Sequence, residues 1–261
     1  MLRITENEDF ESRKQAVDAV IATWQKSVAR VPQKLERELL SKLMISLIYH
    51  DAALEGQVLA HPEIKAAIDT SIISDSSLIP SYEDITNFNA AVTVALELAK
   101  QKIKVNVALI QQLYVILNPA AKASGSPYRD SNPMHRLYYH KIAAPEDVSK
   151  EMKKLDKWLA SAEWAALDPV SKASSTHWRL MSIFPWLDHT GRLARVLSML
   201  ILQQEGYPLP VIHSIDRQEY YEALRNTDME LLSKLYYEAI ETTASSSLQV
   251  YAEAAAYGRA S

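Results

Sequence analysis

The sequence predicts a mainly α-helical fold with one small β element, and three observations support this. Apolar residues recur at helical spacing along most of the 261-residue chain. Only 5 residues are glycine, and glycine-poor sequences rich in alanine and leucine favour helices. Gly125, Pro127, Pro133 and Pro145 interrupt residues 122–145, where we expect turns with a short hairpin or an extended flap.

The predicted helices follow one another with short breaks. Pro32 interrupts the first apolar pattern, Pro119 follows the fifth helix, and Gly206 with Pro208 ends the most apolar one. In chain order the predicted helices cover residues 10–29, 34–53, a short helix opened by Pro62, 82–100, 105–117, 145–159, 169–183, 193–205, 216–226, 229–242 and a last helix from about 248.

The composition narrows the possible chemistry. The absence of cysteine excludes disulfides, zinc–thiolate sites and thiol nucleophiles. A net charge of −4 gives no reason to expect nucleic acid or an anionic membrane as the main partner. The first nine residues are acidic and polar, unlike a signal peptide, and no apolar run approaches the roughly 20 residues that span a bilayer. We therefore expect a soluble, cytoplasmic protein.

The most informative segment is residues 184–195, Phe-Pro-Trp-Leu-Asp-His-Thr-Gly-Arg-Leu-Ala-Arg. A helix that begins here presents free backbone N–H groups and the positive end of its dipole. Gly191 allows the backbone to approach a ligand closely, while Arg192 and Arg195 can each bind phosphate oxygens. Asp188 can hold a magnesium ion that bridges those oxygens. These residues predict an anion site.

This segment resembles the active-site motif of Fic (Fido) proteins, His-Pro-Phe-x-Asp/Glu-Gly-Asn-Gly/Lys-Arg-x-x-Arg. The matching positions are Pro185, Asp188, Gly191, Arg192 and Arg195, with Trp186 as a conservative change. Three positions differ: Phe184 replaces the catalytic histidine, His189 a glycine and Thr190 an asparagine. The chain therefore resembles a Fic protein that keeps the phosphate-binding half of its motif and lacks the base.

The resemblance covers roughly residues 85–245 and implies a Fic/Fido-like helical bundle with a short β-hairpin flap. It divides the chain into an N-terminal helical region at 1–80, a Fic-like core at 81–245, and a C-terminal helix or tail at 246–261. It also implies Mg²⁺ and ATP as cofactors and a protein target. By resemblance, Asp188 holds the metal, the nucleotide contacts Asp188, Thr190, Gly191, Arg192 and Arg195, and the flap residues Leu137, Tyr138 and Tyr139 contact the target. A homodimer is a further expectation.

A second short motif, residues 51–56, ends the predicted helix 34–53. It resembles the inhibitory motif Ser/Thr-x-x-x-Glu-Gly/Asn of some Fic proteins, with Asp51 in place of Ser/Thr and with Glu55 and Gly56 matching. By resemblance, Glu55 pairs with Arg195 and removes the group that would hold a terminal phosphate. The alternative is that Glu55 is a helix-end charge before a glycine C-cap.

The missing histidine determines which function we expect. In active Fic proteins it accepts the proton of a target hydroxyl, which then attacks the α-phosphate of ATP. A base contributes about 100- to 10,000-fold, so AMP transfer should be weak or absent with Phe184 in its place. His189 is a candidate base, unless it is an ordinary histidine at a helix start. Glu55 is a candidate for orienting water that removes AMP from a modified target.

Three hypotheses therefore stand. The first is an enzyme that binds a nucleotide or other phosphorylated ligand and acts by altered chemistry. The second is a non-catalytic Fic-fold protein that binds a nucleotide or a protein partner. The third is a plain helical bundle whose motif similarity is accidental.

Overall fold

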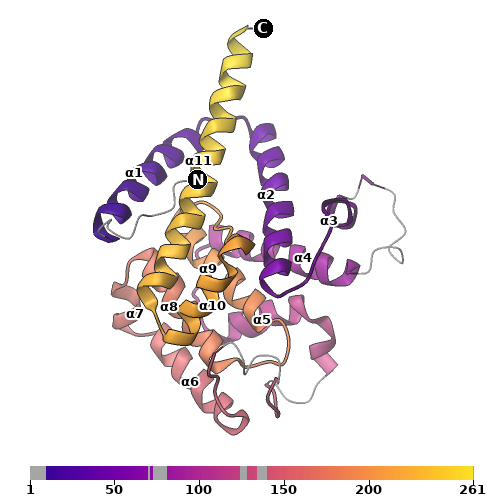
Figure 1. Cartoon of the computed structure of the whole chain (residues 1–261), viewed down its shortest axis with the longest axis vertical. Coiled ribbons are helices and arrows are strands. Elements are labelled where there is room, and N and C mark those ends of the chain that lie inside the picture. The colour runs from indigo at the N-terminus through magenta and orange to yellow at the C-terminus, as the bar shows by residue number, and fades with distance from the viewer. Residues whose placement is uncertain (1–9, 70, 73–80, 124–127, 134–139, 261) are drawn as a thin grey trace.

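The computed structural model describes residues 10–69, 71–72, 81–123, 128–133 and 140–260, and these residues are mainly helical (Figure 1). The predicted fold class is confirmed. The helices are α1 (Phe10–Val28), α2 (Gln33–Leu54), α3 (His61–Ile68), α4 (Tyr82–Lys100), α5 (Val107–Leu117), α6 (Val148–Leu159), α7 (Ala162–Ala166), α8 (Pro169–Ile183), α9 (Thr190–Gln204), α10 (Arg217–Asn226) and α11 (Met229–Ala260).

The predicted hairpin is not seen among the described residues. Leu137, Tyr138 and Tyr139, which we expected to contact a target, lie outside the described part of the chain. The described ends of that segment bind the protein core through their backbones instead of pairing with each other. The N–H of Arg129 donates to Pro185 O at 2.9 Å, and the N–H of Ala143 donates to Ser182 O at 2.9 Å. One end is therefore attached to the loop between α8 and α9, and the other to the last turn of α8.

Helix α9 forms the centre of the molecule and packs on α8, α4 and α5 (Figure 1). Every residue from Thr190 to Leu202 is buried, as is typical of a helix that other helices surround. The helix begins at Thr190, three residues before the predicted start. Its N-terminus, which carries the candidate anion site, is therefore enclosed by neighbouring helices.

Helix α11 corrects the prediction of two separate C-terminal helices, because it runs unbroken from Met229 to Ala260. Serine is a weak helix former, and residues 245–247 are three consecutive serines that interrupt the apolar helical pattern. In the structure, Ala244 and Ser247 are buried, and the Ser247 hydroxyl donates to Thr243 O at 2.6 Å. Packing along α1 outweighs the weak local propensity. The expected boundary at residue 246 falls inside this helix.

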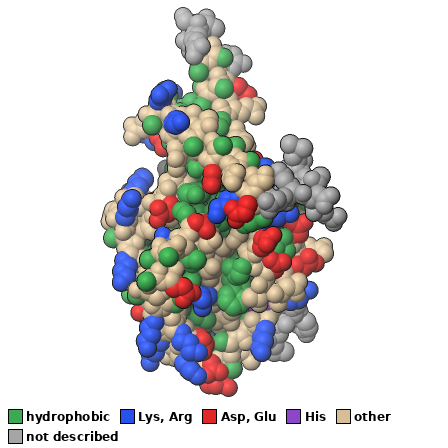
Figure 2. Space-filling view, turned by 90° about the vertical axis from the view of Figure 1, so that its left-hand side faces the viewer, with side chains coloured by type: hydrophobic (Ala, Val, Ile, Leu, Met, Phe, Trp, Pro, Cys, Tyr) green, Lys and Arg blue, Asp and Glu red, His purple; other side chains and the backbone are tan. Residues whose placement is uncertain are grey.

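Helix α7 was not predicted, since its five residues are too few for a periodic signal. Its local cause is an N-cap, in which the Ser161 side chain accepts from the Trp164 N–H at 3.2 Å. None of the described helices combines the length and the hydropathy needed to cross a membrane. On the face shown in Figure 2, basic and acidic side chains are interspersed.

Helix α2 contacts the start of α9 with its C-terminal end. It ends at Leu54, with Glu55 as its C-cap residue. Gly56 follows with a φ of 84°, the left-handed conformation that favours glycine after a helix. The glycine that the sequence predicts at the helix end is therefore present directly after the C-cap residue, and it leaves the Glu55 side chain at the end of α2, beside α9.

Candidate functional site

The loop between α8 and α9 is built on two non-glycine residues with left-handed backbone. Phe184 (φ 49°) ends α8, and its N–H donates to Leu180 O at 2.8 Å. His189 (φ 62°) is the N-cap residue of α9. Such a conformation costs an L-residue about 1–2 kcal/mol, so the surrounding structure must hold it. The Phe184 ring is 1% exposed and fills the core.

A buried arginine, Arg129, holds this loop in place. Its Nε donates to Phe184 O at 2.7 Å, its Nη1 to Ser131 O at 2.9 Å, and its Nη2 to Ala143 O. It also donates to Asn132 Oδ1 at 2.9 Å and to Ile183 O at 3.5 Å. Burial lowers the pKa of Arg129. One side chain thus ties the motif loop to both described ends of the segment that precedes it.

Trp186 and Thr190 complete the loop. The Trp186 ring stacks on Tyr114 with 4.0 Å between centroids, and Trp186 O accepts from the Thr190 hydroxyl at 3.1 Å. Thr190 is fully buried. The structure therefore directs its hydroxyl to the loop backbone. The nucleotide contact of Thr190 that the resemblance implies stays a prediction.

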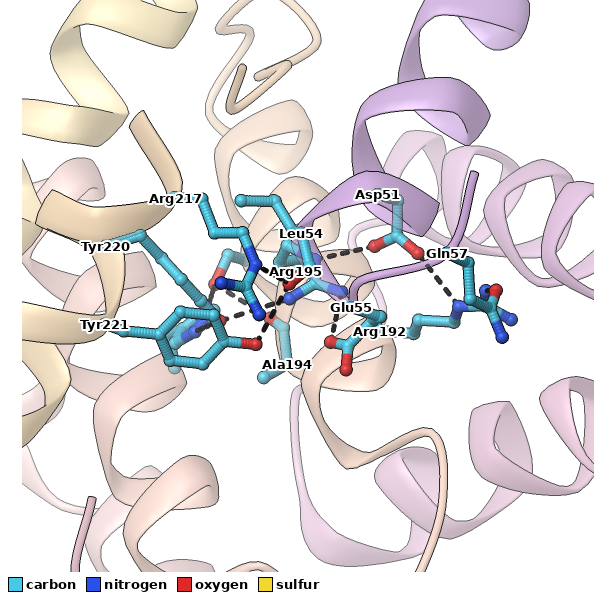
Figure 3. A network of polar contacts seen from close by, with 12 residues as sticks. Asp51, Leu54, Glu55, Gln57, Arg192, Ala194, Arg195, Arg217, Tyr220 and Tyr221 are labelled. Atoms are coloured by element: carbon cyan, nitrogen blue, oxygen red, sulfur yellow. Dashed lines mark hydrogen bonds and ion pairs between the residues drawn. The ribbon is translucent and has the colours of Figure 1, made fainter. Parts of the chain in front are cut away.

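Arg195, in the second turn of α9, binds two carboxylates from α2 (Figure 3). Its Nη2 donates to Glu55 Oε1 at 2.8 Å, and its Nε donates to Asp51 Oδ1 at 2.6 Å. The Glu55–Arg195 pair that the resemblance implies is present. Burial by itself lowers the pKa of Arg195, but the charge and hydrogen bond of Asp51, together with Tyr220 and Tyr221, outweigh burial and hold the pKa above its usual value.

Arg192, one turn earlier, is paired with residues of two other segments as well as with Asp51. Its Nε lies 3.0 Å from Asp51 Oδ2, and its Nη2 donates to Gln57 Oε1 at 2.6 Å. Asp84 of α4 lies on its other side, with 3.4 Å between Oδ2 and Nη1. Asp51 therefore bridges the two arginines of the motif.

The Glu55 carboxylate lies directly against the start of α9. A Cβ placed on Gly191 would overlap Glu55 Oε1, and it would lie 3.2 Å from Arg195 Nη1. Glycine at this position therefore makes room for an oxygen atom beside the helix N-terminus. A helix N-terminus favours negative charge, so the carboxylate occupies a place where another anion would also be stabilised.

Asp188 and His189 lie at the edge of this site. Asp188 is exposed on the motif turn, and His189 is half-buried. Burial, and then the charge of Arg192, lower the pKa of His189, which is therefore neutral at neutral pH. No group of three metal-binding side chains occurs among the described residues. A magnesium ion would depend on Asp188 together with phosphate and water oxygens, as is usual for this ion.

Behind Arg195 lies a buried network of aromatic and imidazole side chains. Arg195 Nη1 donates to the Tyr220 hydroxyl at 3.2 Å, and that hydroxyl lies 2.9 Å from His177 Nε2. His177 Nδ1 lies 2.8 Å from the Tyr236 hydroxyl. Burial lowers the pKa of His177 well below its ordinary value. The neutral imidazole thus helps to fix the guanidinium from the core side.

The structure adds functional candidates that the sequence did not single out. Asp51 stood out only as a departure from the inhibitory motif. Its position four residues before Glu55 places both carboxylates on one face of α2, and this spacing is the signal that could have found it. Arg129, Gln57 and Asp84 offered no such signal, because their partners are distant in sequence.

His50, next to Asp51 on α2, gives a testable pH dependence. Its ring lies 4.3 Å from that of His213, and its Nδ1 accepts from the Ser214 N–H at 3.1 Å. Burial, and then the nearby His213, lower its pKa to about 4. An unfolded chain has a histidine pKa of about 6.5 and binds the proton first. The stabilisation by neutral His50 is therefore complete above about pH 6.5 and is lost as the pH falls towards 4.

We expect the thermal midpoint of a His50→Asn variant to fall less between pH 7 and pH 4 than that of the wild type. Asparagine keeps an acceptor close to the place of Nδ1 and does not titrate. The other titratable groups are the same in both proteins, so the difference between the two curves reports on His50. Parallel curves would contradict the prediction.

The chain is similar in sequence to proteins of a known family. Residues 99–202 match the model of the family described as Fic/DOC family. The chain is 26% identical over 181 residues to the protein adenylyltransferase Fic of Drosophila persimilis, and 28% identical over 183 residues to that of Nematostella vectensis. These alignments cover 68% and 69% of this chain, and 35% and 42% of the relatives. The chain thus spans well under half the length of these curated relatives.

Solved structures agree in fold. A Fic domain containing signaling protein from Bacteroides thetaiotaomicron superposes with a TM-score of 0.77 at 20% identity, covering 91% of this chain and 98% of that one. Fic-1 from C. elegans superposes with a TM-score of 0.71 at 20% identity, covering 92% of this chain and 71% of that one. At these identities the likeness concerns the fold, and the chemistry must be argued from the side chains.

Proposed function

We propose that this chain, of which residues 99–202 match the Fic/DOC family model, binds a nucleotide, or another phosphorylated ligand, at the N-terminus of α9. One observation carries the proposal: the Glu55 carboxylate lies over Gly191 and binds Arg195, as an anionic ligand would. Arg192 and Arg195 are both at most 8% exposed, so an anion that reaches them meets desolvated, strongly attractive charges.

The residues at the site have the chemistry that magnesium and a nucleotide require. Arg192, Arg195 and the free N–H groups of α9 are donors for phosphate oxygens. Asp188 is an exposed carboxylate at the entrance, suited to a metal ion that phosphate oxygens also hold. A bound magnesium ion would neutralise the negative charge of the phosphates. Glu55 has the geometry of an inhibitory group, since it occupies Arg195. Gly56 contributes the turn that places it.

In this proposal the protein is impaired in AMP transfer, because Phe184 cannot accept a proton from a target hydroxyl. His189 is neutral and close to Arg192, so it can accept a proton if the substrate lies on its side of the loop. Glu55 is the other candidate, as a group that orients water. A protein target is proposed to contact the segment that holds Leu137, Tyr138 and Tyr139. A homodimer remains a proposal drawn from the resemblance.

The second candidate function is binding without catalysis, and two observations favour it. The Phe184 ring is buried in the core, and the Thr190 hydroxyl is engaged with Trp186 O. Two of the three positions that differ from the motif, Phe184 and Thr190, therefore serve the packing of the loop. Such a protein would bind a nucleotide or a protein partner and leave it unchanged.

Calorimetric titration of ATP with magnesium tests the proposed site. We expect wild-type binding with a dissociation constant on the order of 100 μM, about −5.5 kcal/mol, because the ligand must displace carboxylates from the arginines. Asp188→Ala should weaken binding about tenfold or more with magnesium, and should match the wild type in EDTA. Glu253→Ala, an exposed acid on α11, is the control and should bind as the wild type does. Equal affinity of the wild type and Asp188→Ala with magnesium would refute the metal role of Asp188.

A further inference from the structure

Two carboxylates hold the arginines of the motif, but they do so unequally (Figure 3). Glu55 binds Arg195 through Nη2 at 2.8 Å. Asp51 binds Arg195 through Nε at 2.6 Å, and its second oxygen lies 3.0 Å from Arg192 Nε. The Asp51 side chain is 2% exposed and that of Glu55 is 11% exposed. Asp51 therefore contacts both arginines, and its side chain is less exposed to solvent than that of Glu55.

The two carboxylates also differ in how they can move away from the arginines. Glu55 is the C-cap residue, so its side chain can turn away while α2 stays in place. Asp51 lies inside α2, in its last turn, and its short side chain offers little reach. The carbonyl oxygen of Leu54 accepts from Arg217 Nε at 2.9 Å and from the Tyr221 hydroxyl at 3.2 Å. These contacts from α10 fix the last turn of α2, so Asp51 departs only if that turn moves.

The Asp51 arrangement is not optimised for stability. Asp51 Oδ2 and Arg192 Nε are buried, yet neither makes a hydrogen bond, although the two atoms lie within ion-pair distance. Buried groups without hydrogen bonds are costly, which makes their persistence informative. A ligand anion that satisfies Arg192 Nε would remove part of this cost.

From these contacts we propose that Asp51 is the principal gate of the anion site, and that Glu55 is the secondary one; this inference rests on the proposed function. A ligand that displaces only Glu55 gains a single nitrogen of Arg195. Arg192 and Arg195 Nε stay paired with Asp51 until the last turn of α2 moves away. The gate thus couples anion binding to movement of α2, and removing the glutamate alone does not open the site.

The test compares ATP binding, with magnesium, by the wild type, Glu55→Gly, Asp51→Ser, Asp51→Asn and the Asp51→Ser/Glu55→Gly double variant. Glu55→Gly should raise affinity by no more than about threefold, whereas Asp51→Ser and Asp51→Asn should each raise it about tenfold or more. Asparagine keeps the shape of Asp51 and removes its charge, so it separates charge from packing. Glu38→Gln, an exposed acid on the same helix, is the control and should leave affinity unchanged. The gate is refuted if Glu55→Gly alone binds as tightly as the double variant.

Hydrogen exchange gives a second readout that needs no ligand. Backbone amides of residues 48–54 should exchange about tenfold faster in Asp51→Asn than in the wild type, and close to the wild-type rate in Glu55→Gly. Equal protection in Asp51→Asn and the wild type would overturn the gate. If exchange behaves as expected and not even the double variant binds ATP, the gate stands as a structural device while the proposed nucleotide site fails. The two ideas are therefore distinguishable.

Discussion

Phe184→His is expected to raise transfer of AMP from ATP to protein by about 100- to 10,000-fold, the usual contribution of a positioned base. The physical reason is that, in the proposed site, Arg192, Arg195 and Asp188 supply positioning and charge stabilisation, and the introduced histidine supplies the proton acceptor that Phe184 cannot provide. The measurement is covalent labelling of the protein, or of an added protein mixture, from ATP labelled in its α-phosphate. Because Asp51 and Glu55 restrict the site, the histidine is best tested both alone and with Asp51→Ser/Glu55→Gly.

The control for this experiment is Phe184→Leu, which removes the aromatic ring without adding a base. Label in the histidine variant and none in the leucine variant would attribute the activity to the imidazole. If the histidine variant stays unlabelled even with both carboxylates removed, a missing base is not the reason for inactivity. Binding without catalysis would then be the better account, with Thr190 and His189 as the positions that reshape the loop.

Arg129→Met is expected to destabilise the protein by about 3 kcal/mol or more. Methionine fills similar space, but it leaves the buried carbonyl oxygen of Phe184, and the partly buried acceptors of the Ser131 and Ala143 bonds, without their donor. Each buried polar group left unsatisfied costs about 1–3 kcal/mol. The loss should be seen as a lower midpoint in urea-induced unfolding, followed by circular dichroism.

Arg129→Lys is a second variant that tests the same hydrogen bonds. Lysine keeps the positive charge but presents one compact donor group, so it cannot reach acceptors on three sides and should recover little of the stability. Arg37→Met, on the exposed face of α2, is the control, and its effect should stay within about 0.5 kcal/mol. An Arg129→Met variant as stable as this control would show that the motif loop holds its shape without the guanidinium.

Most of the helix order could be predicted, because burial of one face leaves a periodic record in each helix. The exceptions have physical causes. Helix α7 is shorter than two turns and carries no periodic signal. The continuity of α11 through residues 245–247 depends on packing against α1, which the local sequence does not encode.

The part of the candidate site that lies on one helix could be predicted from local sequence. Gly191, Arg192 and Arg195 share the first turns of one helix, so their spacing alone predicted an anion site. The pairing of Glu55 with Arg195 came from resemblance, and the contact is present across 140 residues of sequence. Asp51 reaches Arg195 across 144 residues, and the sequence offered only the shared face of α2 as a hint.

The sequence alone thus determined that this chain is helical, that a positively charged helix start follows residues 184–189, and that no histidine stands at position 184. These are properties of neighbouring residues, set by periodicity, side-chain chemistry and backbone freedom. Only the tertiary structure decided that Asp51 bridges both arginines and that Arg129 holds the motif loop. Those contacts depend on how distant helices pack, and packing is a cooperative outcome of the whole core, which no local pattern specifies.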